Sequence, residues 1–294
     1  MINYSVIIPH KNCLDLLGRC LNSIPNRSDI EVIVIDDNSG IDRIDEQIRA
    51  MSNLPNLNVI VLPESRFAGG ARNAGLKVAK GSWLVFADAD DFFTPNAFVI
   101  MDKHLASTHD IIFFAHTAVY SDTLEPAERL GSRLKYIEEY RKHRTKKAED
   151  YLRYINHSPV AKMIRHSLII EHNLKFDEVL ASNDAMFTVT SGYHARSIMS
   201  DNGVVYCATI RRGSLTQTRS KENAYSRYSV EIALYDFFRD KGLSHLYPFL
   251  TMWCVNALRY YGVKEFAKYI SLAYKHKVNI FLGLTRRFNS RYKY

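Results

Sequence analysis

The feature of this chain that most constrains its fold is a series of short apolar runs near the N-terminus, separated by segments with helical periodicity. Such runs are uninterrupted rather than alternating, which is typical of strands buried on both faces of a sheet. We therefore predict an α/β fold with a doubly wound, mostly parallel sheet. The predicted strands are Ser5–Pro9, Ile30–Ile35, Val59–Leu62, Trp83–Ala87 and Ile111–Ala115, and the predicted helices between the first four are 14–24, 42–52 and 68–80.

Polar clusters follow three of these predicted strands. They are His10-Lys11-Asn12 after the first strand, Asp36 to Ser39 after the second and Asp88 to Asp91 after the fourth. Ligands of open parallel sheets bind beyond the carboxyl ends of the strands. We therefore expect the three clusters to meet at one crevice.

The acidic cluster is a candidate site for a metal ion and a diphosphate. Asp88 and Asp90 are two residues apart on a turn, so their carboxylates can point the same way. Mg²⁺ and Mn²⁺ take oxygen ligands and can bridge carboxylates to phosphate. The alternative is a solvated acidic turn that begins the following helix, because a short motif of this kind often occurs without function.

Four blocks of the sequence resemble family-2 glycosyltransferases of the GT-A fold, in the order and spacing of that family. The resemblance is close over the first hundred residues and looser to about Thr218. It implies a nucleotide-diphosphate sugar donor, preferably a uridine one, and a glycan or lipid-linked acceptor in surface polysaccharide synthesis. The blocks are Ser5 to Asn12, Val32 to Ser39, Gly70 to Gly75 and Gly81 to Asp91.

The same resemblance implies roles for individual residues. Asp37 would accept a hydrogen bond from the uracil imide, and Asp90 would bind Mn²⁺ or Mg²⁺. The alternatives are that Asp36 and Asp37 cap a helix, and that Arg72 is a surface charge. The expected donor-binding residues are Pro9, His10, Asn12, Asp37, Arg72, Asp88 and Arg212.

A later acidic motif, Asn183 to Phe187, resembles the family segment whose aspartate is the catalytic base. Asp184 is the matching position. In inverting transfer, one carboxylate takes the proton of the acceptor hydroxyl as it attacks the anomeric carbon. Asn183 stands where the family usually has glutamate, and the alternative for Asp184 is an N-cap.

The chain is expected to form a GT-A domain over residues 1–220, with a nucleotide-sugar-binding half at 1–110 and an acceptor half at 111–220. The basic stretch Arg129–Lys147 is predicted to be a mobile loop or an exposed helix. Residues 221–294 are expected to form a helical, basic extension, with helices near 230–238, 249–260 and 266–274.

The net charge of +8 lies mostly in this extension, since residues 264–294 hold eight Lys or Arg against one Glu. Basic and apolar residues together suit the surface of an anionic membrane, and the alternative is a helical cap with a basic outer face. The four cysteines show no metal-binding spacing, and the N-terminus does not resemble a signal peptide. We therefore expect a cytoplasmic protein, either free or peripheral on the cytoplasmic face of the membrane.

Two other functions compete with sugar transfer. A nucleotidyltransferase also uses carboxylates and a metal, but usually carries a glycine-rich phosphate loop where this chain has Pro9 to Asn12. A basic nucleic-acid-binding protein would fit the isoelectric point near 9.2. The acidic clusters at the strand ends oppose the second alternative because they would repel phosphates, so no nucleic-acid partner is expected.

Overall fold

The computed structural model describes residues 1–127, 131–210 and 220–281. The chain forms two compact units. The sheet unit comprises Met1–Glu178 and Phe187–Arg212, and the helical unit comprises Val179–Met186 and Gly213–Tyr294. The assignment of residues 179–186 to the helical unit is a grouping that the sequence did not suggest.

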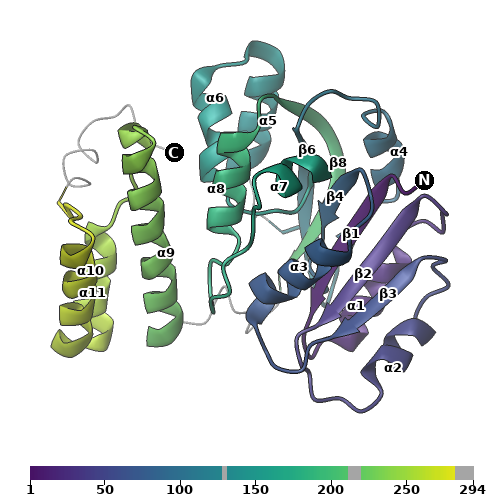
Figure 1. The fold of residues 1–294 in the computed structure, drawn as a ribbon, viewed down its shortest axis with the longest axis horizontal. Coiled ribbons are helices and arrows are strands. Elements are labelled where there is room, and N and C mark those ends of the chain that lie inside the picture. The colour runs from purple at the N-terminus through teal and green to yellow at the C-terminus, as the bar shows by residue number, and fades with distance from the viewer. Residues whose placement is uncertain (128–130, 211–219, 282–294) are drawn as a thin grey trace. The chain divides into compact units, whose positions relative to one another are not determined.

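The sheet unit contains an eight-stranded sheet with the strand order β3-β2-β1-β4-β7-β6-β8-β5. β1 lies parallel to β2 and β4, β2 to β3, and β6 to β8, whereas β7 runs antiparallel to β4 and β6, and β5 to β8. Figure 1 shows β1, β2 and β3 as neighbouring purple to blue arrows. The mostly parallel sheet is thus confirmed. The strands are β1 Tyr4–His10, β2 Ile30–Asp36, β3 Leu57–Val61, β4 Trp83–Phe86, β5 Phe92–Phe93, β6 Ile111–Tyr120, β7 Lys162–Arg165 and β8 Ile198–Ile210.

Helices cover both faces of this sheet. Those that begin in the first hundred residues are α1 Leu14–Asn22, α2 Ile44–Ala50, α3 Phe67–Val78 and α4 Ala97–Asp102. They are followed by α5 Gly131–His143, α6 Lys146–Asp150, the π-helix η1 Tyr151–Ile155, α7 His166–Glu171 and α8 Ala185–His194.

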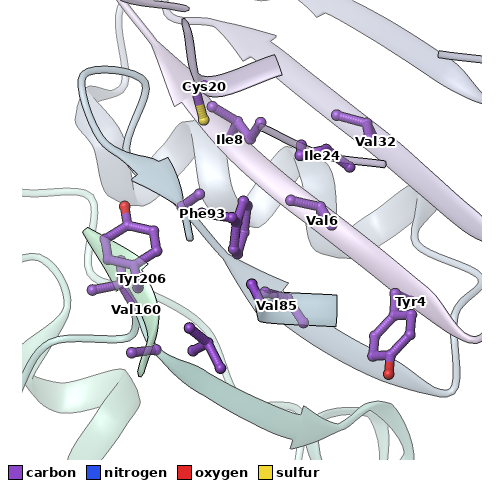
Figure 2. Close-up of a cluster of buried hydrophobic side chains, with 14 of the residues drawn as sticks. Tyr4, Val6, Ile8, Cys20, Ile24, Val32, Val85, Phe93, Val160 and Tyr206 are labelled. Carbon is purple, nitrogen blue, oxygen red and sulfur yellow. The ribbon is translucent and has the colours of Figure 1, made fainter. Parts of the chain in front are cut away.

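The apolar runs are continuous because alternate residues of each strand enter different cores. Val6 and Ile8 of β1 belong to one cluster with Cys20 of α1, and Figure 2 shows them together. Ile7 belongs to a second cluster with Ala71 of α3. Since both faces exclude water, most positions in the strand favour apolar side chains, and the buried Ser5 is satisfied by donating to Glu31 of β2.

Gly75 sets how closely α3 approaches the sheet. A Cβ atom at this position would lie 2.6 Å from Ile7 Cγ2 and 2.9 Å from Ile35 Cδ1. Any side chain would therefore push the helix away from β1 and β2. The glycine thus fixes the position of Arg72, which lies one turn earlier on the same helix.

The segment 129–147 differs from the prediction of a loop or exposed helix. Its described part forms α5 and the start of α6, and Tyr136, Ile137 and Tyr140 of α5 are buried in the second core cluster. The basic residues Arg141 and Lys142 remain exposed. Three apolar positions among many charged ones are enough to pack one face of the helix against the sheet unit.

In the helical unit, α9 Lys221–Asp240, α10 Thr251–Tyr261 and α11 Val263–Lys275 share one core. The 3₁₀ turn η2 Ser244–Leu246 lies between α9 and α10 in the chain. Tyr228 and Tyr269 stack with ring centroids 4.4 Å apart. The three predicted helices are present, and α9 begins earlier because Ser220 Oγ accepts a hydrogen bond from the Asn223 N–H at 3.1 Å. Within the described ranges, no helix combines the length and apolar character that a membrane span requires.

Candidate active site

The three polar clusters lie along one edge of the sheet. β1 pairs in parallel with both β2 and β4, so the carboxyl ends of the three strands are neighbours. His10 is in register with Asp36, and the Asp37 N–H donates to the His10 carbonyl at 2.8 Å. The acidic cluster begins two residues after β4. The structure thus brings the predicted clusters together.

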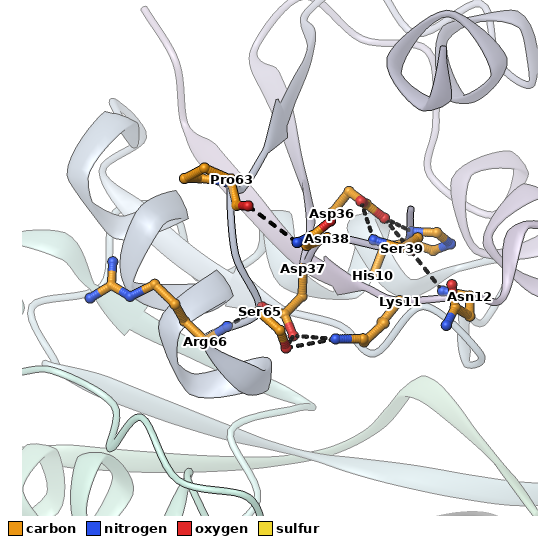
Figure 3. A network of polar contacts seen from close by, with 10 residues as sticks. All are labelled: His10, Lys11, Asn12, Asp36, Asp37, Asn38, Ser39, Pro63, Ser65 and Arg66. Atoms are coloured by element: carbon orange, nitrogen blue, oxygen red, sulfur yellow. Dashed lines mark hydrogen bonds and ion pairs between the residues drawn. The ribbon is translucent and has the colours of Figure 1, made fainter. Parts of the chain in front are cut away.

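His10 and Asp36 form a buried pair at the base of this edge. His10 Nδ1 lies 2.7 Å from Asp36 Oδ1, and His10 Nε2 accepts a hydrogen bond from the Cys13 N–H at 3.3 Å. Nδ1 therefore carries the hydrogen and donates a hydrogen bond to the carboxylate. Asp36 also accepts from the Ser39 N–H at 2.9 Å, so the pair holds the turn after β2 (Figure 3).

The structure shows where the three predicted donor-binding residues of the first cluster, Pro9, His10 and Asn12, lie. The His10 side chain is 0% exposed and faces Asp36, so it shapes the turns around the site. Asn12 is exposed, with a left-handed φ of 52°, and its N–H donates to Ser39 Oγ at 2.9 Å. Pro9 is half-buried near the end of β1. Direct contact of these three residues with a donor stays a prediction.

Asp37 is buried beneath a set of hydrogen-bond donors. Its carboxylate accepts from the Arg66 N–H at 2.6 Å, Ser65 Oγ at 2.6 Å and Lys11 Nζ at 3.3 Å (Figure 3). The alternative that Asp36 and Asp37 cap the following helix is wrong, because α2 begins at Ile44 and its N-cap is Arg43. Asp37 instead links the ends of β1 and β2 to the start of α3.

Arg72 joins α3 to the acidic cluster. Its Nη2 lies 2.6 Å from Asp88 Oδ1, and its guanidinium lies over the Phe176 ring at 5.3 Å from the centroid. The Arg72 side chain is only 6% exposed, so the surface-charge alternative is wrong. The Asp88 side chain is 42% exposed and open to a ligand.

Asp91 is the buried member of the acidic cluster. Its carboxylate accepts from Tyr206 Oη at 2.9 Å and from the Thr209 N–H at 2.6 Å. The same hydroxyl accepts a hydrogen bond from the Asp88 N–H at 2.9 Å. Burial, together with the charges of Asp88 and Asp90, raises the pKa of Asp91 to about 8. Through the hydrogen bonds of Tyr206 and Thr209, β8 clamps the turn that carries the cluster, which means that it holds this turn in place.

Asp90 lies in the middle of this clamped turn. Its carbonyl accepts from Arg19 Nη2 at 2.8 Å and from Thr209 Oγ1 at 2.9 Å, and its side chain is half-buried. The turn does not begin a helix, since the next helix starts at Ala97. The alternative of a solvated helix-starting turn is therefore wrong.

The acidic cluster suits a divalent ion that is completed by a ligand. Asp88 and Asp90 offer two half-buried carboxylates, and among the described residues no group of three or more His, Cys, Asp or Glu could hold a metal. Mg²⁺ is commonly held by one or two carboxylates together with water and substrate phosphates. The residues present fit an ion bound with a diphosphate.

The structure leaves two predicted site residues, Asp184 and Arg212, untested. Asp184 belongs to the helical unit, where it is half-buried just before α8. Its role as the base stays a prediction. Arg212 lies outside the described residues. Sequence reasoning missed Arg19, Tyr206 and Thr209, because no local pattern links them to the acidic turn.

Comparison with known proteins identifies the family. The Glycosyl transferase family 2 model matches residues 5–172, which are 168 of the 294 residues. The chain belongs to glycosyl transferase family 2. This glycosyltransferase carries its strand-end clusters within the matched range, whereas Tyr206 and Thr209 lie beyond it. Membership of the family does not favour the nucleotidyltransferase or nucleic-acid-binding alternatives.

Among curated relatives, the glycosyltransferase is similar to the poly(ribitol-phosphate) β-N-acetylglucosaminyltransferase TarS of Staphylococcus aureus (strain Mu50), with 27% identity over 72% of this chain and 36% of TarS. It is also similar to the UDP-Glc:α-D-GlcNAc-diphosphoundecaprenol β-1,3-glucosyltransferase WfaP of Escherichia coli, with 29% identity over 45% of this chain and 55% of WfaP. The chain thus aligns with less than two thirds of the length of each.

Solved structures confirm the fold of the glycosyltransferase. S. aureus TarS 1–349 in complex with UDP-GlcNAc has a TM-score of 0.60 at 21% identity, covering 99% of this chain and 76% of TarS 1–349. The mannosyltransferase PcManGT of Pyrobaculum calidifontis, in complex with GDP-Man and Mn²⁺, also has a TM-score of 0.60, at 17% identity over 97% of this chain and 79% of that one. The fold is of the GT-A type, as predicted.

Proposed function

We propose that this glycosyltransferase moves a sugar from a uridine-diphosphate sugar to a glycan or lipid-linked acceptor, with inversion, in surface polysaccharide synthesis. The observation that carries the proposal is the clamped acidic turn, which places Asp88 beside Arg72 at the strand edge that also holds Asp37. The names of TarS and WfaP support the donor and acceptor classes, and the ligands of the TarS and PcManGT structures support a nucleotide-sugar donor and a divalent ion.

In this proposal the residues of the sheet unit bind and orient the donor. Asp37 accepts the imide hydrogen of the base, Arg72 contacts the base or the diphosphate, and Asp88 contacts the ribose or the sugar. Asp90 holds Mn²⁺ or Mg²⁺, which when bound neutralises charge on the diphosphate. The Arg72 guanidinium is paired with Asp88 and lies over the Phe176 ring, on a helix that packs closely on the sheet at Gly75.

The transfer step uses Asp184 as the base. It takes the proton of the acceptor hydroxyl while that oxygen bonds to the anomeric carbon from the face opposite the diphosphate. The bond between the anomeric carbon and the diphosphate oxygen breaks with its electron pair, and the nucleoside diphosphate departs. Asn183 precedes the base where the family usually has glutamate, so a single carboxylate carries this role.

Isothermal calorimetry with UDP, GDP, CDP and dTDP, each with and without Mn²⁺, tests the donor site. We expect Mn²⁺-dependent binding of UDP to the wild type, loss of that dependence in Asp90→Ala and no change in Asp240→Ala, which removes an exposed carboxylate. Asp184→Asn should bind UDP like the wild type but transfer no sugar. If no diphosphate binds with Mn²⁺, or if Asp184→Asn turns over normally, the proposal is wrong.

We also propose that the helical unit attaches to an anionic membrane surface. Lys264, Lys275 and Lys277 are exposed, and so are the apolar side chains of Val263 and Tyr274. Exposed basic and apolar groups together favour the interfacial zone of an anionic bilayer. Other apolar side chains of the same stretch, Phe266, Tyr269 and Leu272, pack in the core of the helical unit and do not belong to this surface.

Liposome flotation tests this attachment. Because deletion of α11 would remove part of that core, we choose a charge reversal, Lys264, Lys275 and Lys277→Glu. We expect the wild type to float with vesicles that contain anionic lipid and the triple variant to stay at the bottom of the gradient. Equal flotation of both forms would contradict the proposal. The matched control reverses three exposed lysines of the sheet unit, Lys103, Lys142 and Lys175.

A further inference from the structure

Lys11 lies over Asp37 at the edge of the sheet, although it was not among the predicted donor-binding residues. Its Nζ lies 3.3 Å from Asp37 Oδ2 and donates to Ser65 Oγ at 2.6 Å (Figure 3). The Lys11 side chain is 44% exposed, whereas the Asp37 side chain is 4% exposed. Lys11 therefore stands between solvent and the carboxylate that is proposed to bind the base.

The donors around Asp37 differ in how freely they can move. Oδ1 accepts from the Arg66 N–H, which is main chain at the start of α3. Oδ2 accepts from Ser65 Oγ and Lys11 Nζ, which are carried on exposed, rotatable side chains. A ligand can replace a side-chain donor at Oδ2 without moving the helix, and the displaced Lys11 keeps a charged donor beside the ligand.

This arrangement matches the hydrogen-bonding edge of uracil, which thymine shares. Uracil presents a carbonyl, an N3–H and a second carbonyl, and so requires an acceptor flanked by a donor. Asp37 only accepts, and Lys11 only donates. Cytosine presents an unprotonated N3, which would face the carboxylate without a proton between them. Guanine presents one carbonyl and two adjacent donors, which a carboxylate binds best with both of its oxygens, whereas Asp37 Oδ1 already accepts from the Arg66 N–H.

We propose that Lys11 is a specificity-determining residue that, together with Asp37, recognises uracil. On binding, the uracil N3–H donates to Asp37 Oδ2, and Lys11 Nζ turns from that oxygen to donate to a carbonyl beside N3. This inference rests on the proposed function, because it assumes that the edge of the sheet binds a nucleotide donor. It adds the residue that selects the base.

Calorimetry with two probes separates recognition of the base from binding of phosphate. The probes are UDP and inorganic pyrophosphate, each with Mn²⁺, and the variants are Lys11→Met and the control Lys77→Met, which removes an exposed lysine of α3. We expect Lys11→Met to weaken UDP binding by about tenfold to hundredfold, as for loss of a charge-assisted hydrogen bond. Pyrophosphate affinity should stay within about twofold, and Lys77→Met should bind both probes like the wild type.

A second variant tests the same pair through its preference between bases. The amide of Asp37→Asn can donate to the N3 of cytosine, so the ratio of UDP to CDP affinity should fall by about a hundredfold or more. Equal losses of UDP and pyrophosphate in Lys11→Met would make Lys11 a phosphate ligand, and unchanged UDP binding would make it a surface charge. Either result overturns the inference alone, whereas a wild type that binds no nucleotide overturns the proposed function as well.

Discussion

Removal of one hydroxyl, in Tyr206→Phe, tests whether β8 holds the acidic turn. Tyr206 is 0% exposed, and its hydroxyl donates to Asp91 and accepts from the Asp88 N–H, both at 2.9 Å. The variant keeps the ring and its contact with Phe93, whose centroid lies 5.6 Å away. It therefore removes two hydrogen bonds and almost no packing.

The expected loss follows from the two groups left without this partner. Each buried polar group that loses its partner costs about 1 to 3 kcal/mol, and Asp91 keeps the bond from the Thr209 N–H, which places its share at the lower end. We expect the free energy of unfolding to fall by about 2 to 4 kcal/mol. The Mn²⁺-dependent affinity for UDP should fall as well, because the turn that carries Asp88 and Asp90 is held less firmly.

Urea denaturation, followed by circular dichroism, measures the fall in the free energy of unfolding. An unchanged slope of this free energy against urea concentration would show that the folded state stays compact. The control is Tyr120→Phe, because Tyr120 is exposed at the end of β6 and should tolerate the change. A Tyr206→Phe protein within about 0.5 kcal/mol of the wild type would refute the clamp.

Three further predictions use other parts of the structure. Gly75→Ala should lower the free energy of unfolding, measured in urea, by about 1 to 3 kcal/mol, because the added Cβ would clash with the sheet. The control Gly18→Ala in α1, whose added Cβ meets nothing within 4 Å, should raise the free energy of unfolding by up to about 1 kcal/mol. Equal effects of the two substitutions would contradict the close packing of α3. Arg72→Lys should weaken UDP binding in calorimetry by about tenfold, since the lysine ammonium cannot keep both the ion pair with Asp88 and the contact with the Phe176 ring. Unchanged UDP binding would show that Arg72 is not part of the donor site. Burial lowers the pKa of His157 from 6.5 to about 4, so the unfolded chain binds a proton first as pH falls. Stability should therefore be lost between pH 6.5 and 4, by about 1 to 3 kcal/mol, and His157→Gln should flatten this part of the stability profile measured in urea.

The positions of the strands and of the polar clusters were predictable because they depend on local patterns. A strand buried on both faces is mostly apolar, and its carboxyl end is marked where polar residues follow the apolar run, as at His10 and Asp36. Once the sheet is parallel, those ends must lie at one edge. The four family motifs then distinguish this edge from that of any other doubly wound sheet.

Other parts of the site depend on contacts that no local pattern contains. The bonds from Tyr206 and Thr209 to Asp91 span 115 and 118 residues. The pairing of His10 with Asp36 follows from the register of β1 and β2, which sequence alone leaves open. Lys11 lies in a predicted polar cluster but was not among the predicted donor-binding residues, since the sequence does not distinguish a lysine beside a motif from the solvated lysines found on any protein surface.

The distance along the chain between the acidic turn and its clamp has a consequence for how the protein is made. β1 to β4 can pair as soon as they leave the ribosome, because they lie within the first hundred residues. The turn at residues 88–91 waits for β8, which is synthesised more than a hundred residues later, and such distant pairings form slowly. Domains form from the N-terminal end during synthesis. A growing chain thus passes through a stage at which its sheet has begun to form while its acidic turn is not yet locked, and the turn is locked only after β8 has been synthesised.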